Sequence, residues 1–282
     1  TIVEVSSEEM ETAKVIYGGG KGATVTGNST VTVTVPNITT PTWSLDNISG
    51  SGTNADGSTL ADNVAGTKKV SIAMKDEKKP GTLQLRQLAG FDELELGNVT
   101  TESCELSVFK ISERFDSETV EPQAGVRKER TGKVTLNSST LTLDGNYNGQ
   151  IGSMEVKGTG ESVLGVYKVN TNNTKPLQVY GTMTLENTAR PLKINAIKAG
   201  RVNNELNDVI LEFADATNAK EESYVDGSGN NLPVGKDWEK IKFYDKSIHD
   251  VTGYVEYPET VEGPDDNQKV SVNLDTNTTK AG

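Results

Sequence analysis

The residues best suited to holding a ligand lie in an oxygen-rich segment toward the C-terminal end of the chain. Residues 226–231 read Asp-Gly-Ser-Gly-Asn-Asn, and an aspartate follows at the twelfth position of the segment. Calcium loops place oxygen ligands at such spacings, which here select Asp226, Ser228, Asn230 and Asp237. Asn231 stands where those loops carry glycine, and asparagine tolerates a positive φ. The segment therefore predicts a calcium site, with an ordinary Gly/Asn turn as the alternative.

Calcium suits this chain better than a softer metal, because the chain has 40 acidic residues but only one histidine and one cysteine. Asn54–Ser58 repeats the oxygen-rich pattern in a shorter form. If calcium binds at 226–237, excess calcium should raise the midpoint of thermal unfolding above its value in chelator. Asp226→Ala should abolish that difference. Equal midpoints of the unmodified chain in calcium and in chelator would contradict the predicted site.

The residues that usually perform catalysis are sparse. His249 lies between Asp245 and Asp250 and could act as a ligand or a base, the alternative being a loop histidine bonded to a neighbour. Cys104 would need a base to act as a nucleophile, and the one histidine is 145 positions away, so we expect a small buried side chain. The acidic pairs Glu93/Glu95, Glu221/Glu222 and Asp265/Asp266 are interpreted as surface charge. We therefore expect no enzyme.

A second candidate site is aromatic. Aromatic faces suit pyranose rings, and the residues that could form a sugar-stacking platform are Trp238, Tyr244, Tyr254 and Tyr257, together with Trp43. Core anchoring is the alternative role for Trp238.

The composition excludes some classes of partner. The net charge is -12 and the pI is about 4.7, so nucleic acid and anionic lipid are disfavoured. No run of 18 apolar residues occurs, so we expect no membrane insertion. The chain begins at Thr1, and we expect a mature product or a piece of a longer protein.

The local pattern indicates strands almost throughout. Residues 24–35 alternate Thr and Val, which predicts one apolar and one hydroxylated face. A short helix before Gly18 is the one helical candidate. Asn47–Gly66 is interpreted as a long loop, and the charged residues 112–130 as a solvated excursion. Further strands are predicted at 70–74, 82–88, 93–96, 106–111, 133–136, 140–143, 153–156, 163–169, 177–180, 183–185, 192–197 and 209–213.

These patterns predict an all-β protein with an elongated β-solenoid or stacked-sheet body, because only 33% of the residues are hydrophobic. Two β-sandwich domains are the alternative. We expect an N-terminal β segment at 1–46, the solenoid-like body at 67–215, and a C-terminal β segment with loops at 216–282. Weak self-similarity relates 87–94, 150–156 and 251–257, at irregular spacing.

The runs Gly90–Val99, Gly132–Leu136 and Thr140–Gly145 resemble the coils of large Thr/Gly-rich repetitive surface proteins of bacteria. Those proteins include β-solenoid adhesins and autotransporter-type passengers, and the resemblance covers about residues 80–215. It implies a secreted, non-catalytic structural or adhesive module on the bacterial cell surface, such as a surface-layer segment. Its partners would be host or cell-surface glycans or proteins, or copies of itself. A carbohydrate-binding module and a β-helix polysaccharide-degrading enzyme are the alternatives.

Overall fold

The structure of the protein is a computed structural model. It describes residues 1–6, 14–39, 42–100, 103–120, 130–143 and 148–167, and then shorter segments at 177–180, 183–185, 192–197, 209–213, 224–226, 241–244, 254–256 and 269–273. The described residues form strands and no helix, as the all-β prediction required. No helix long and apolar enough to cross a membrane therefore occurs in this part of the chain.

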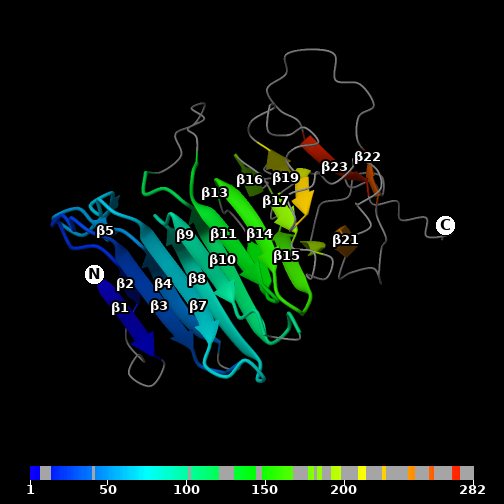
Figure 1. Cartoon of the computed structure of the whole chain (residues 1–282), viewed down its shortest axis with the longest axis horizontal. Coiled ribbons are helices and arrows are strands. Elements are labelled where there is room, and N and C mark those ends of the chain that lie inside the picture. The colour runs from blue at the N-terminus through cyan, green and yellow to red at the C-terminus, as the bar shows by residue number, and fades with distance from the viewer. Residues whose placement is uncertain are drawn as a thin grey trace, which may run out of the picture.

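The first sheet has eight parallel strands (Figure 1). In spatial order they are β1 (Ile2–Ser6), β3 (Ser29–Val35), β7 (Lys68–Met74), β9 (Glu93–Gly97), β11 (Lys133–Asn137), β14 (Ser153–Lys157), β17 (Met183–Leu185) and β20 (Tyr224–Asp226). The spatial order follows the order along the chain, so each new strand of this sheet is added beside the preceding one.

The second sheet begins in the same way and then divides. Its first four strands are β2 (Val15–Tyr17), β4 (Trp43–Ser49), β8 (Gly81–Ala89) and β10 (Ser107–Asp116). One branch continues with β12 (Thr140–Leu143), β15 (Ser162–Tyr167), β18 (Leu192–Ile197) and β21 (Ile241–Tyr244). The other continues with β13 (Asn148–Ile151), β16 (Leu177–Val179), β19 (Val209–Phe213), β23 (Lys269–Asn273) and β22 (Tyr254–Glu256), the last two being antiparallel.

Strand β10 supports both branches because it is long and interrupted. Its residues Val108–Ile111 pair with β12, and Arg114–Asp116 pair with β13. A register irregularity separates the two halves between Ile111 and Arg114. From β11 onward the chain therefore places one strand in the first sheet and two in the second before it returns.

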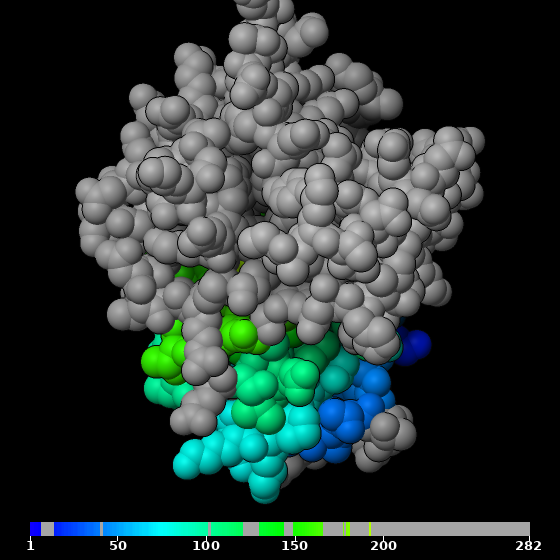
Figure 2. Space-filling view, turned by 90° about the vertical axis from the view of Figure 1, so that its right-hand side faces the viewer, coloured from blue at the N-terminus to red at the C-terminus, as the bar shows by residue number. Residues whose placement is uncertain are grey.

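The chain alternates between the sheets, and parallel pairing aligns like residues in rows. Val31, Val70, Leu94, Val134 and Met154 are register partners in the first sheet. Successive partners in this row are 39, 24, 40 and 20 residues apart. The variable spacing explains why no fixed sequence period is visible. In the space-filling view, segments coloured from blue through cyan to green pack against one another (Figure 2).

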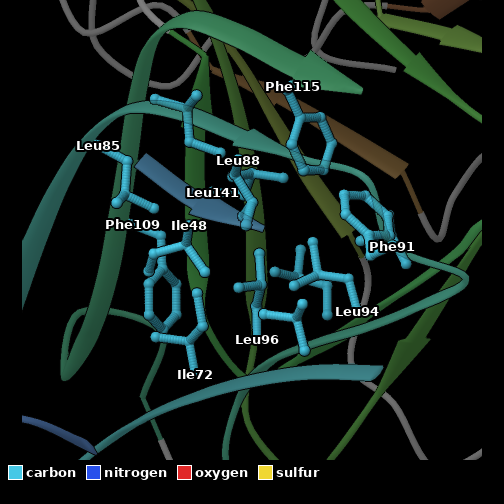
Figure 3. Packing of buried hydrophobic residues seen from close by; sticks show 14 of the residues in the cluster. Ile48, Ile72, Leu85, Leu88, Phe91, Leu94, Leu96, Phe109, Phe115 and Leu141 are labelled. Carbon is cyan, nitrogen blue, oxygen red and sulfur yellow. The ribbon is translucent and has the colours of Figure 1, made fainter. Parts of the chain in front are cut away.

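The core lies between the sheets and consists mainly of aliphatic side chains. Trp43, Leu83, Phe109, Leu141 and Leu164 form one row in the second sheet, and all but Trp43 are fully buried. Inward residues of the two sheets meet in one cluster (Figure 3). In β3, valines alternate with threonines, and the three valines are only 0–1% exposed. The alternation of residue types along the strand therefore determines which side chains enter the core.

Most predicted strands are confirmed, and the differences have local causes. The predicted strand at 24–35 begins only at Ser29, because Gly27 interrupts its row of valines. Residues Val15–Tyr17 of the suggested helix form β2, since they pair with Asn47–Ser49 of β4. Asn47–Ser49 therefore belong to strand β4 and not to the predicted loop at 47–66. The rest of that loop contains a short hairpin of β5 (Gly52–Thr53) and β6 (Leu60–Ala61).

The charged region at 112–130 is not simply a solvated excursion. Strand β10 continues through it to Asp116. Arg114, Asp116 and Arg130 have exposures of 5%, 0% and 5%. Three buried charges in one place are tolerated because they pair with one another.

Gly90 is required at the turn that leads from β8 to β9. Its φ is +68°, and a Cβ added there would lie 2.8 Å from both Ser49 Oγ and Thr119 Cγ2. Gly90→Ala should therefore lower the free energy of unfolding by roughly 1–3 kcal/mol. Gly27→Ala is the matched control, because its added Cβ would meet nothing within 4 Å. Urea unfolding followed by circular dichroism measures both, and equal midpoints would contradict the assigned turn.

Candidate functional site

A polar hollow is formed by three segments that lead from the second sheet back to the first. We call residues 18–28, 50–67 and 90–92 the return loops, and the depression between them the corner hollow. Its volume is about 620 Å³, and it is lined by Thr24, Asn28, Asp62, Asn63, Val64, Ala65, Gly66, Thr67, Lys68 and Asp92. Most of the lining is polar, so the corner hollow differs from the apolar pockets that drug-like ligands prefer.

Backbone pairing holds the first two return loops side by side. Val25 and Val64 form an isolated parallel bridge, in which Val25 N donates to Asn63 O at 2.8 Å and Ala65 N donates to Val25 O at 2.8 Å. The parallel pairing of the neighbouring strands thus extends into the loops. The bridge therefore joins two walls of the hollow directly.

Two asparagines complete this framework. Asn63 accepts a hydrogen bond from Gly52 N at 2.9 Å and donates to Gly20 O at 2.5 Å. Asn28 Oδ1 accepts from Thr67 N at 2.9 Å. Both amides therefore connect one return loop to the next, a role that no local sequence pattern indicates.

Lys68 belongs to the lining of the hollow and lies between two carboxylates. Its Nζ is 3.1 Å from Asp62 Oδ1 and 3.4 Å from Asp92 Oδ1. Asp92 Oδ2 also accepts a hydrogen bond from Lys68 N at 2.7 Å. The Lys68 side chain is 13% exposed, whereas those of Asp62 and Asp92 are 59% and 39% exposed. The ammonium is held in place, and both carboxylates still face solvent.

Burial by itself lowers the pKa of Lys68, but the hydrogen bond to Asp62 and the charge of Asp92 outweigh it and raise that pKa above its ordinary value. The lysine is therefore protonated at neutral pH. With one ammonium and two carboxylates, the corner hollow carries a net charge of about −1.

The outer faces of the sheets carry paired charges. On the first sheet, Lys69 Nζ lies 3.8 Å from Glu93 Oε2. Glu155 forms ion pairs with Lys133 and with Lys157, whose Nζ is 3.2 Å from Glu155 Oε1. On the second sheet, Arg86 binds Glu113 with two hydrogen bonds of 2.7 and 2.8 Å. The exposed pairs Lys69–Glu93 and Arg86–Glu113 contribute little stability individually and neutralise charge across neighbouring strands. Glu155 is only 17% exposed, and it pairs both with Lys133 of β11 and with Lys157 of its own strand.

A buried ionic cluster lies where β10 ends. Arg130 Nε donates to Asp116 Oδ1 at 2.8 Å, and Arg114 donates to Glu118 O at 3.0 Å and lies 3.4 Å from Asp116 Oδ2. Burial raises the pKa of the Asp116 carboxyl, and the Glu118 N–H and the two guanidiniums oppose that rise. The cluster joins the end of β10 to the start of β11, so its geometry indicates a structural role.

The predicted calcium and aromatic sites fall largely outside the described residues. Asp226 ends β20, Tyr244 ends β21 and Tyr254 begins β22, and these three are described only as strand positions. Ser228, Asn230, Asp237, Trp238, Tyr257 and His249 lie outside the described residues. Both sites remain predictions.

Three other predictions can be compared with side-chain positions. Cys104 is 7% exposed, as expected of a small buried side chain. Trp43 packs partly buried against the core. In the short oxygen-rich segment, Asn54 Oδ1 and Asp56 Oδ1 both accept from Ser58 N, at 3.0 and 2.7 Å, so these oxygens cap a turn.

Among the residues that the structure describes, no group of three or more His, Cys, Asp and Glu side chains could hold a metal ion. Comparison of the chain with protein-family models, curated proteins and solved structures finds no match. The arrangement of the described strands and the corner hollow are therefore the features that bear on function.

Proposed function

We propose that this chain is a non-catalytic structural and adhesive module of a secreted bacterial cell-surface protein. The observation that carries the proposal is the in-register parallel stacking of strands along two sheets, which displays polar side chains on a continuous framework. Such a rigid framework suits a protein that presents an extended binding surface to glycans, to other proteins or to copies of itself.

We infer that the finer architecture is a β-solenoid. The chain order β1, β2, β3, β4 alternates between the sheets, and so does β7, β8, β9, β10. Sandwich domains are built mainly from antiparallel hairpins, whereas a solenoid stacks parallel strands coil upon coil. Small-angle scattering tests this inference, because a radius of gyration near roughly 19 Å, the expectation for a compact globule of this length, would contradict an elongated solenoid.

Binding measurements test the adhesive role. The labelled full chain is applied to an array of surface glycans, to immobilised extracellular matrix proteins and to immobilised copies of itself. Saturable binding to at least one of these supports the proposal, and the absence of binding to any of them contradicts it. In parallel, the chain is incubated with neutral and acidic polysaccharides, and new reducing ends or unsaturated sugars would show an enzyme instead.

Carbohydrate binding is the second candidate function, and the corner hollow favours it. The aromatic residues at 238–257 offer a different location for the same activity. Loss of glycan binding in Trp238→Ala would place the contact at those aromatic residues.

A further inference from the structure

We propose that the corner hollow binds a neutral or amine-bearing saccharide through Asp62, Lys68 and Asp92. The inference rests on the proposed adhesive function and names the contact site and the class of ligand. It places the contact in the N-terminal third of the chain, far along the sequence from the aromatic residues at 238–257.

The charges of the hollow exclude several other ligand classes. A free metal cation would have to displace the Lys68 ammonium, which lies 3.1 and 3.4 Å from the two carboxylates. A phosphate, sulfate or uronate would face two carboxylates against one ammonium, so it would be repelled. An apolar ligand would leave the polar lining without hydrogen bonds.

A saccharide matches what remains. Its hydroxyls both donate and accept, and the hollow offers carboxylate acceptors beside an ammonium donor and the hydroxyls of Thr24 and Thr67. The corner hollow is an open surface depression of about 620 Å³, so it can contact one face of a short oligosaccharide while the other face remains in solvent. An amine on the sugar would add a charge-assisted hydrogen bond to Asp62, whose side chain is 59% exposed.

The site is also preorganised. Asp92 is held by the backbone of Lys68 at 2.7 Å, and Asn28 and Asn63 connect the surrounding return loops. Binding would therefore require little ordering of the protein, which lowers the entropic cost of association.

The test uses the full chain and arrays of neutral, amine-bearing, sulfated and uronate oligosaccharides, followed by titration with the strongest hit. Asp62→Ala removes an exposed acceptor, and Ala65→Gln adds bulk to the lining. We expect the hits to be neutral or amine-bearing, and each variant to weaken binding about tenfold or more. Glu93→Ala, which removes an exposed carboxylate outside the lining, should bind as the unmodified chain does.

The outcomes separate this inference from the proposed function. Anionic hits, or sugar binding unaffected by Asp62→Ala and Ala65→Gln, would overturn the corner hollow as the site and leave the adhesive role standing. Binding only to proteins or to other copies of the chain would likewise overturn the saccharide site and leave the adhesive role standing. Circular dichroism melts of both variants establish that any loss of binding is not due to unfolding.

Discussion

Asp116→Ala should lower the free energy of unfolding by roughly 3–5 kcal/mol, the usual result of removing one partner from a buried ion pair. The Asp116 side chain is fully buried, and Arg130 Nε lies 2.8 Å from its Oδ1. Without the carboxylate, two buried guanidiniums lose their shared partner, and the Glu118 N–H loses its acceptor. Guanidinium chloride unfolding, followed by circular dichroism at neutral pH, measures the change.

The matched control is Glu113→Ala, three residues earlier in the same strand. Glu113 pairs with Arg86 at 2.7 Å, but both side chains are largely exposed, at 42% and 57%. Its removal should produce a far smaller change, because water replaces the lost partner. Similar losses of stability in the two variants would contradict a special role for the buried cluster.

Phe115→Ala should also lower the free energy of unfolding by roughly 3–5 kcal/mol, the usual range for truncating a buried phenylalanine. The Phe115 ring is fully buried and lies 6.0 Å from the ring of Phe91, between centroids. Phe115 also aligns with Leu88 and Gly149 in neighbouring strands. Gly149 has no side chain to fill the space, so the cavity would persist and add to the lost burial.

Two further variants make this prediction specific. Phe115→Leu retains most of the apolar volume and should destabilise less than Phe115→Ala. Val120→Ala, at a position that is 54% exposed, should have little effect. If Phe115→Ala and Val120→Ala unfold at the same denaturant concentration, the assigned packing between the sheets is wrong.

The local sequence pattern located most strands because period-two alternation reflects burial directly. Thr140–Leu143, Met183–Leu185, Leu192–Ile197 and Val209–Phe213 coincide with β12, β17, β18 and β19. Strand β13 was missed, because its sequence Asn-Gly-Gln-Ile has one apolar residue and a glycine. It forms a strand because β10 and β16 pair with it on either side.

The self-similarity between 87–94 and 150–156 has a structural counterpart. Both segments connect the second sheet to the first, by way of β8 to β9 and of β13 to β14. The third segment, at 251–257, contains β22, which pairs antiparallel with β23. Two of the three segments are thus equivalent turns, and the strands β10, β11 and β12 with their connections separate them along the chain.

The candidate site could not be predicted from local sequence. Asp62 and Asp92 lie in two successive return loops and Lys68 begins β7. No spacing rule joins an exposed loop aspartate to residues 6 and 30 positions later. The burial of Arg114, Asp116 and Arg130 was likewise hidden, since a dense run of charges ordinarily indicates a solvated segment.

The sequence by itself determined the strand content, the alternation of inward and outward residues, and the aliphatic core, because each depends on contacts that repeat every two residues. The tertiary structure alone decided which strands are neighbours, where β10 divides the second sheet, and which polar side chains meet. Those features depend on parallel pairings between segments 20 to 40 residues apart, and connections of variable length between the strands leave no constant period from which that register could be inferred.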